Sequence, residues 1–476
     1  MRVGFATADV TPALGMETPG GFAKAYHVKF HDRCLASAMV IEQDGERVAF
    51  VGLDTLSVKG GIVRAARQMI EEKCGIKGTN LMVGASHSHA SGPIVGAFPG
   101  EFARSFDPEL CEDLAQNQAT SANREYCAQV SRAIASAVII ADQNKEDALL
   151  SIGNGEERTV AFNRRFWMQN GKQMTHPGKG NPDIVKPAGP VDPAVGVLGA
   201  WRPDGSFLGC LVNFTCHGTT GNGGTSADWI HWLRETITSG MGGGHVVFLN
   251  GACGDVTQVN NLSTEESEFG EKWSRRVGQK VGAEALKVLC MAEPSELGPL
   301  AAKQEYIKIQ TREVSEKLFA EALAFYRSDP PQGWDRWLAR DLILLHEMNK
   351  WEPVITAEVQ AIQVGPAVLV SSGAEYFCQF GLSIKHRSQF PFTYVVELAN
   401  QSIGYVPTPE AMGPNGGGYE PVLCCSSKLI PEAGQMIEDT SVELVNSLTP
   451  SEAPQMPQAP QAEVAWDVNM SKMATV

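Results

Sequence analysis

Short apolar runs alternate with polar, glycine-rich segments along most of the chain. Near the N-terminus, RVGFATADVTP, ASAMVIEQ and ERVAFVGLDTL each have the pattern of a short strand. Asp44 and Gly45 separate the last two, and an Asp-Gly pair between two strands is typical of a β-hairpin turn. Gly60–Lys73 then has apolar positions at helical spacing, and TNLMVGASHSH predicts another strand. This alternation predicts an α/β layered core.

The middle of the chain continues the same pattern. Pro108–Ala141 is expected to be helical with a break near Gln118–Asn123. Two further apolar runs, FLGCLVNFTCH and HVVFLNGACGD, predict strands that each end in a polar, glycine-rich loop. Thr264–Ala292 has the spacing of an amphipathic helix.

The C-terminal third predicts more strands and two accessory segments. Residues 301–351 are rich in Lys, Glu and Arg at helical spacing, so we expect a helical insertion outside the core. VITAEVQAIQVGPAVLVSSGAE and TYVVELANQSIGYVPT each predict a pair of strands. Residues 450–476 are dominated by Pro, Gln and Ala, and such a tail cannot form a packed core. We therefore expect one large mixed-sheet α/β domain over residues 1–449, followed by a flexible tail.

Composition and charge exclude some classes of function. The net charge is −15 and no cluster of Lys and Arg stands out, which argues against a nucleic-acid partner. No run of about 18 apolar residues predicts a transmembrane helix, and MRVGFATADVTPALG lacks the apolar region of a signal peptide. The eleven cysteines are scattered without a CxxC pair, as in a protein with reduced thiols. We expect a cytoplasmic protein with a small-molecule substrate, and the pattern leaves the oligomeric state open.

Reactive side chains follow four of the predicted strands. They are the pair His87 and His89, then His217, Asp255 and Glu375. Functional sites of α/β sheets gather where strands end. In an extended chain, a His-x-His pair directs both imidazoles to the same face. We therefore expect these loops to form one pocket.

Each of these residues also has a purely structural explanation when taken alone. A His-x-His pair is more often on the surface or in a satisfied core, Glu375 fits a helix N-terminus, and Asp255 fits a helix cap after a glycine turn. Together they are more informative, because two or three imidazoles with a carboxylate are the usual ligands of a catalytic zinc. Such a zinc lowers the pKa of its bound water to about 7.

Seven motifs occur in an order that resembles a known family. They are ADVTP, VGLDTL, ASHSHASGP, NFTCHGTT, NGACGDVTQ, SSGAEYFCQFGLSIK and ELANQSIGYVPT…GGGYE. In this order they resemble the neutral/alkaline non-lysosomal ceramidases over residues 1–430. The resemblance implies an α/β catalytic domain whose strand-end loops form a zinc pocket. It also implies hydrolysis of an amide (N-acyl) bond by metal-activated water.

The resemblance also implies a role for each residue of the site. The implied zinc ligands are His87, His217, Glu375 and Tyr405. The implied catalytic residues are His89, which transfers a proton, and Arg164 and Tyr419, which bind the developing oxyanion. Because Arg165 is adjacent to Arg164, the match to the family's arginine could be shifted by one residue. Tyr405 also fits a strand tyrosine whose hydroxyl caps a loop. Asp255 and Asp228 are expected to orient the ligand imidazoles as carboxylate partners, and Asp54 is a further candidate.

The substrate is less well indicated than the metal site. The family usually has Thr-His-Thr-His-Ser-Gly-Pro where this chain has Ser-His-Ser-His-Ala-Ser-Gly-Pro, and its members are longer and usually secreted or membrane-associated. Loops rich in Gly and Asn flank the expected site, so we expect a substrate that is smaller or more polar than ceramide. Two alternatives remain: a lyase or glycoside- or ester-active enzyme with the same metal site, and a non-catalytic relative with a structural metal.

Overall fold

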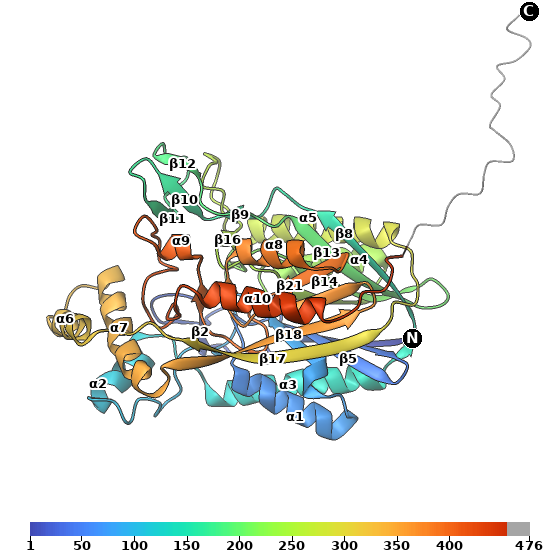
Figure 1. Ribbon diagram of the computed structural model, residues 1–476, viewed down its shortest axis with the longest axis horizontal. Coiled ribbons are helices and arrows are strands. Elements are labelled where there is room, and N and C mark those ends of the chain that lie inside the picture. The colour runs from blue at the N-terminus through green and yellow to red at the C-terminus, as the bar shows by residue number, and fades with distance from the viewer. Residues whose placement is uncertain (455–476) are drawn as a thin grey trace, which may run out of the picture.

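Three mixed sheets form the core of the computed structural model, which describes residues 1–454 (Figure 1). Residues 455–476 of the expected tail lie outside the described residues. The first sheet has the order β6-β5-β4-β1-β7, with β1 Arg2–Asp9, β4 Leu35–Gln43, β5 Glu46–Leu53, β6 Leu81–Ala85 and β7 Glu146–Asp147. The second has the order β15-β14-β13-β8, with β8 Leu149–Glu156, β13 Ala194–Trp201, β14 Phe207–Phe214 and β15 His245–Asn250. The third has the order β17-β18-β19-β21, with β17 Leu300–Gln310, β18 Val354–Val364, β19 Ala367–Ser371 and β21 Phe392–Val396.

Helices cover the outer faces of these sheets. The long ones are α1 Gly60–Cys74, α3 Arg124–Gln143, α4 Trp229–Met241, α5 Glu271–Met291, α6 Glu316–Arg327, α7 Trp334–Trp351, α8 Cys378–Arg387 and α10 Ala433–Asn446. The short ones are η1 Gly78–Asn80, α2 Pro108–Asp113, the π-helical turn Leu114–Gln118 and α9 Pro409–Met412. In Figure 1, α1 and α3 lie on one side of the sheets, and α5 and α8 lie on the other. The helices therefore form the two outer layers, and the sheets form the layers between them.

Small strand pairs complete the fold around the loops. They are β2 Glu17–Thr18 with β3 Ala25–Tyr26, β9 Phe162–Asn163 with β16 Val256–Thr257, β20 Glu375–Tyr376 with β22 Tyr405–Val406, and a sheet of β10 Arg165–Met168, β11 Gln173–Thr175 and β12 Ile184–Pro187. Apart from this last sheet, each consists of two short strands. The predicted α/β class with mixed sheets is confirmed, whereas the division into a domain and a tail stays a prediction.

Buried apolar side chains fill the spaces between the layers. One cluster lies between the first sheet and the helices α1 and α3, with Val51, Ile70 and Ile134 among its members. A second cluster joins the first sheet to the other two, and it includes Phe50 and Leu369. β6, which has both faces covered, is buried along its whole length. This packing fixes the strand ends that carry the polar loops.

The β4–β5 hairpin shows how local sequence sets part of the fold. Asp44 has φ 51° and Gly45 has φ 84°, so both turn residues are in the left-handed region. A two-residue turn of this kind matches the twist of the flanking strands. The turn expected from the Asp-Gly pair is therefore confirmed. The expected break in the helix after Pro108 is also present, because Asn123 caps the N-terminus of α3 by accepting a hydrogen bond from the Tyr126 N–H at 2.9 Å.

The expected helical insertion begins with a strand instead. Residues 300–310 form β17, which pairs along its whole length with β18, and helices occupy only 316–327 and 334–351. β17 is an edge strand, and Lys303, Glu305 and Lys308 are exposed on it. Charged side chains on an edge strand protect it from pairing with other chains. The charges that resembled a solvated helix therefore belong to a sheet edge.

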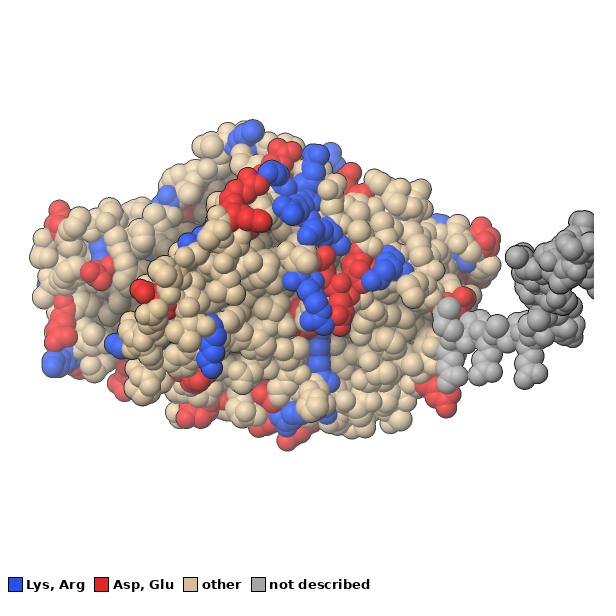
Figure 2. Space-filling model, turned by 90° about the horizontal axis from the view of Figure 1, so that it is seen from above, with Lys and Arg blue, Asp and Glu red and all other residues tan. Residues whose placement is uncertain are grey.

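Charged side chains of both signs share the molecular surface. Figure 2 shows Lys and Arg in a band across one face, with Asp and Glu beside them. Two ion pairs show the same mixture. Lys272 Nζ of α5 lies 2.5 Å from Oε1 of Glu266, which precedes the helix, and Lys287 Nζ lies 2.6 Å from Glu284 Oε1 within it. Within residues 1–454, no helix has both the length and the apolar character needed to cross a membrane.

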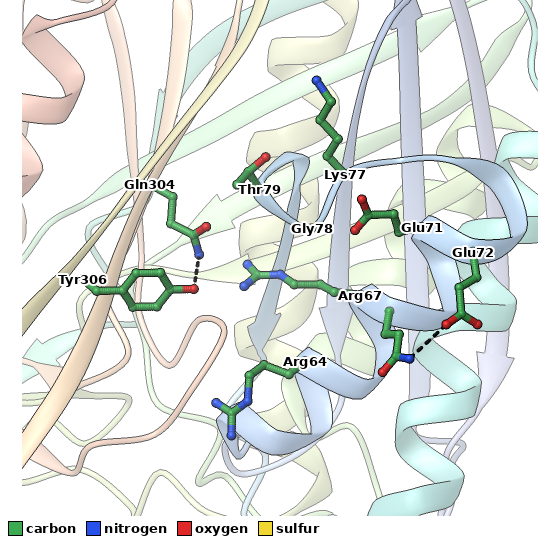
Figure 3. A pocket seen from close by; sticks show the side chains of 10 residues that line it. Arg64, Arg67, Glu71, Glu72, Lys77, Gly78, Thr79, Gln304 and Tyr306 are labelled. Carbon is green, nitrogen blue, oxygen red and sulfur yellow. Dashed lines mark hydrogen bonds between the residues drawn. The ribbon is translucent and has the colours of Figure 1, made fainter.

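A buried ion pair joins α1 to the third sheet and provides a test of stability. The guanidinium of Arg67 donates to both carboxylate oxygens of Glu358, at 2.9 and 2.8 Å, beside a surface pocket that Arg64 also lines (Figure 3). Arg67→Leu leaves the buried Glu358 charge without its main partner, so we expect unfolding to become easier by about 3–5 kcal/mol. Urea denaturation measures this change. Arg64→Leu, on the exposed side of the same helix, is expected to stay within about 0.5 kcal/mol, and equal shifts in both variants would contradict the role of the ion pair.

Candidate metal centre and active site

The predicted site residues gather where parallel strands end. Each of the three sheets contains one parallel pair, β5 with β6, β14 with β15, and β19 with β21. Parallel strands place their carboxyl ends at the same edge of a sheet. His87 and His89 follow β6, His217 follows β14, and Glu375 follows β19. The packing of the three sheets directs these ends to one region.

Short backbone bridges then bring the loops into contact. Ser88 forms a parallel bridge with Gly218, which places the His-x-His loop beside the loop of His217. Glu375 and Tyr405 are register partners in the two-residue pair β20–β22. The four predicted zinc ligands therefore reach the site from loops that are held together by main-chain pairing.

The His-x-His spacing suggested an extended chain at His87, but the backbone there is not extended. β6 ends at Ala85, and His87 has φ 62°, in the left-handed region. Its imidazole and that of His89 still converge, with their Nε2 atoms 3.3 Å apart. The two rings meet because of this bend rather than because of strand alternation.

All three imidazoles are held by backbone carbonyl groups. The Nδ1 of His87 donates to Leu56 O at 2.7 Å, that of His217 to Val256 O at 3.1 Å, and that of His89 to Gly20 O at 3.2 Å. A donating Nδ1 leaves the Nε2 of the same ring without a hydrogen, so the lone pair of that Nε2 can bind a cation. The ligating atoms of the three rings lie within 4.8 Å of one another. Such a hydrogen bond from the other ring nitrogen is typical of metal-binding histidines.

Glu375 faces the same point with an unsatisfied oxygen. Its Oε2 lies 3.4 Å from the Nε2 of His87 and 3.7 Å from the Nε2 of His217. Among the described residues, this buried oxygen has no hydrogen-bond partner. A buried polar atom without a partner costs free energy. Lone pairs of nitrogen and oxygen that face one another in this way suit a cation.

Charge and burial set the ionisation of these groups. Burial lowers the pKa of His217 well below its ordinary value, and the positive charge of Arg164 lowers it further. Burial raises the pKa of Glu375, but His87, Tyr405 and Arg164 together outweigh this effect, and the net shift is downward. Burial lowers the pKa of His87, but the charges of Glu375 and Glu397 and the hydrogen bonds to the ring together outweigh burial, and the net shift is upward. Glu375 is thus an anion and His217 a neutral imidazole, as metal ligation requires.

Arg164 connects the imidazoles with the tyrosines. Its Nη1 lies 3.1 Å from the Nε2 of His217, and its Nη2 lies 3.2 Å from the hydroxyl of Tyr405 and 2.7 Å from Gly254 O. The guanidinium carbon also lies 5.1 Å from the ring centre of Tyr419. Between the two adjacent arginines, Arg164 is therefore the one that reaches the site.

Two solved structures have a similar fold over most of the chain. The neutral ceramidase from Pseudomonas aeruginosa is 20% identical, with 95% of this chain and 76% of that chain covered at a TM-score of 0.68. A ceramidase complexed with C2 is 18% identical, with 98% and 78% covered at a TM-score of 0.68. The chain has a neutral ceramidase-like fold. No family model matches the sequence, and no curated protein sequence matches it.

Asp255 and Asp228, two carboxylates expected near the site, both lie at helix N-termini. Asp255 accepts hydrogen bonds from Asn163 Nδ2 at 2.7 Å and from the N–H of Cys378, the first residue of α8, at 2.8 Å. It therefore holds a helix N-terminus, which is the structural alternative for this residue. Asp228 accepts from the Trp229 N–H at 2.8 Å and begins α4. Neither carboxylate is hydrogen-bonded to an imidazole of the site, because backbone carbonyls occupy those ring nitrogens.

Asp54 is paired with an arginine, and His89 is less buried than the other two histidines of the site. Asp54 forms a buried ion pair with Arg234, whose Nη1 is 2.6 Å from its Oδ2, and thus has a structural partner. His89 is half-buried, whereas His87 and His217 are buried. All three rings have the same carbonyl contact, so the division of roles between His87 and His89 stays a prediction.

Sequence reasoning missed Glu420, which organises the arginines. Its carboxylate accepts from Arg164 Nε at 2.9 Å and from Arg165 Nη1 at 2.8 Å, and it is fully buried. Burial raises its pKa, but the two arginines outweigh burial and the net shift is downward. The one signal in the sequence is its place next to Tyr419 in GGGYE. The carbonyls of Leu56 and Val256, which orient two imidazoles, have no signal because any residue supplies a carbonyl.

Proposed function

We propose that this chain is a zinc-dependent hydrolase that cleaves an amide (N-acyl) bond. The observation that supports the proposal most is the buried Oε2 of Glu375, which has no hydrogen-bond partner among the described residues and faces imidazole nitrogens. Imidazoles with one carboxylate are ligands that zinc prefers. The motif order and the ceramidase-like fold support hydrolysis as the class of reaction.

The residues of the site fit a zinc ion. His87, His217 and Glu375 would hold it, with the hydroxyl of Tyr405 as the fourth ligand. Bound zinc supplies a Lewis acid and lowers the pKa of a water to about 7. Burial raises the pKa of Tyr405 well above its ordinary value, and the charge of Glu375 raises it further, so the free site holds a protonated phenol.

The other residues bind the substrate and move its protons. Arg164 and Tyr419 donate hydrogen bonds to the carbonyl oxygen of the amide as water adds to the carbonyl carbon. His89 accepts a proton from the attacking water at its free Nε2 and returns it to the amide nitrogen. The C–N bond then breaks, and the products are a carboxylic acid and an amine, which become a carboxylate and an ammonium ion when the acid gives its proton to the amine.

The expected substrate is a small molecule, more polar or smaller than ceramide. TTGNGGTSADW and GPNGGGYE, two loops rich in Gly and Asn, support this proposal because they flank His217 and Tyr419 in the sequence. All eleven cysteines are free thiols in the structure, which supports a reducing compartment and the proposed cytoplasmic location.

Metal analysis tests the proposed cofactor. We expect purified protein to hold about one equivalent of zinc, in line with a single site of this ligand type. A strong chelator should remove the zinc together with amide hydrolysis, and stoichiometric zinc should restore both. Elemental analysis and a product assay on the same samples measure the two quantities. Activity that survives complete metal removal would contradict the proposal.

Labelled water separates hydrolysis from the alternative chemistries. A hydrolase incorporates one oxygen from water into the acid product, so reaction in H₂¹⁸O should label the carboxylate. A lyase reaction leaves the product unlabelled. A screen of N-acyl amines, N-acyl amino acids, esters and glycosides on the zinc-loaded protein then identifies the bond that is cleaved.

A further inference from the structure

A row of aromatic rings leads from the candidate site to the surface. The ring centre of Tyr405 lies 6.1 Å from that of Tyr419, in an edge-to-face arrangement. Tyr419 lies 5.9 Å from Phe22, again edge to face. Phe22 stacks on Trp337 at 5.3 Å and meets Trp334 edge to face at 5.3 Å. Each step is within the range of favourable aromatic contacts.

The outer rings of this row are open to solvent. Phe22 is 44% exposed and Trp334 is 40% exposed, whereas Tyr405 and Tyr419 are half-buried. Exposed aromatic side chains grouped together next to a functional site are typical of a binding surface rather than of a core. We call Phe22, Trp334 and Trp337 the aromatic platform.

Specific contacts fix the platform relative to the metal site. Phe22 belongs to the loop between β2 and β3, and its carbonyl accepts a hydrogen bond from Arg340 Nη1 at 3.2 Å. The same Nη1 donates to Gln118 O at 2.5 Å. Two residues before Phe22, the carbonyl of Gly20 accepts the Nδ1 hydrogen of His89 at 3.2 Å. The loop therefore touches a residue of the site at one point and α7, which carries both tryptophans, at another.

Close packing explains why Gly20 occupies this loop. Gly20 has φ 96°, and a Cβ atom added there would lie 2.3 Å from His89 Nδ1. A residue with a side chain would therefore move either the loop or the imidazole. The platform and the site are joined through a contact that only glycine permits.

We propose that the platform binds an aromatic ring in the acyl part of the substrate, while its amide lies at the metal site. This inference rests on the proposed function and names its substrate class: N-acyl compounds whose acyl chain ends in a planar ring. A flat ring can stack or meet these rings edge to face, which favours it over a saturated ring of similar size. Two ring-to-ring steps separate Tyr405 from Phe22, the nearest ring of the platform, so the row runs from the site toward the platform.

Hydrolysis of matched substrates tests the preference. The probes are the N-acetyl, N-(4-phenylbutanoyl) and N-(4-cyclohexylbutanoyl) derivatives of one amine, with zinc-loaded full-length protein. We expect kcat/KM for the phenyl probe to exceed that for the cyclohexyl probe by about five-fold, in line with the additional attraction between aromatic rings. In Phe22→Leu and in Trp334→Leu, the ratio of kcat/KM for the phenyl probe to that for the cyclohexyl probe should fall to about one. An equal kcat/KM for the two ring probes in the unchanged protein would overturn the inference.

Trp351→Leu is the matched control on the same helix. Trp351 is 43% exposed at the other end of α7 and contacts Phe102, outside the row. Its removal should leave the ratio of the two ring probes unchanged, and a similar loss of ratio in Trp351→Leu would contradict the platform.

A binding measurement separates failure of this inference from failure of the proposed function. The protein is titrated with the phenyl or the cyclohexyl probe, and binding is followed by tryptophan fluorescence. If the protein hydrolyses the probes, its metal is removed first. We expect the phenyl probe to bind about five-fold more tightly, and Trp334→Leu to abolish the difference. Preferential binding without hydrolysis would keep the platform and reject the amidase function. Hydrolysis of the acetyl probe with equal binding of the two ring probes would keep the amidase function and reject the platform.

Discussion

His87→Ala is expected to lose bound zinc and amide hydrolysis together. The Nε2 of His87 lies 3.4 Å from the unpartnered Oε2 of Glu375, so its removal takes away one of the groups that converge on the expected ion. Zinc per chain should fall to near background in elemental analysis, and kcat should fall with it. Because His87 has φ 62°, alanine adds backbone strain at this position. His87→Asn tolerates that conformation better and should show the same loss.

His89→Ala is the matched comparison, because the two rings are neighbours. We expect this variant to keep most of its zinc and to lose rate, since His89 is half-buried and is assigned to proton transfer. Retention of equal zinc by both variants would contradict the division of roles. Loss of zinc in both would instead indicate three imidazole ligands, which the 4.8 Å grouping of their nitrogens permits.

Arg164→Lys is expected to lower kcat by about 100-fold or more without removing zinc. Arginine donates from a planar fork, here toward His217 and Tyr405 at 3.1 and 3.2 Å, and lysine offers only one donor centre. Loss of one oxyanion donor typically costs about 100- to 1,000-fold in kcat. Steady-state kinetics and metal content, measured on the same preparation, separate this effect from loss of the ion.

Arg165→Lys controls for the neighbouring register. Arg165 donates to Glu420 and Gln173, at 2.8 and 2.7 Å, and has no hydrogen bond to the imidazoles. We expect its substitution to lower stability, because the pair with Glu420 is buried, and to change kcat much less than Arg164→Lys. A larger loss of kcat in Arg165→Lys than in Arg164→Lys would contradict the assignment of the oxyanion contact to Arg164.

The cluster around Glu420 explains why the two arginines act differently. One carboxylate binds both guanidinium groups, so each arginine is fixed by a buried charge. Burying charges is costly unless they are paired and hydrogen-bonded. Here the pairing aims Arg164 at the imidazoles and Arg165 at Gln173. The position of a charge, rather than its presence, thus distinguishes the two residues.

Much of the fold could be predicted because local patterns determine local structure. The apolar pattern of β4 and β5 and the Asp-Gly turn between them are enough to predict this hairpin. The helical spacing of apolar residues is likewise enough to predict α1. β17 was predicted wrongly for the opposite reason. Its exposed charges are compatible with either a helix or an edge strand, and only its pairing with β18 decides between them.

The candidate site was predictable by residue type but not by contact. The motif order indicated His87, His217, Glu375 and Tyr405, and the structure brings them together. The pairing of Glu375 with Tyr405 involves strands of two residues, which are too short for any periodic signal. Backbone carbonyls hold the Nδ1 atoms of His87 and His217 in the structure, and the role expected for Asp255 at the site stays a prediction.

Many of the strands, most of the helices and the chemical groups at the strand ends could be predicted from the sequence alone, because they depend on side-chain type and spacing along the chain. The tertiary structure decided which of those ends meet. It closed three parallel strand pairs onto one point, oriented each imidazole with a carbonyl from another loop, and placed Phe22 of an N-terminal loop against Trp334 and Trp337. Contacts between residues far apart in sequence depend on how whole sheets pack, and no local pattern records that packing.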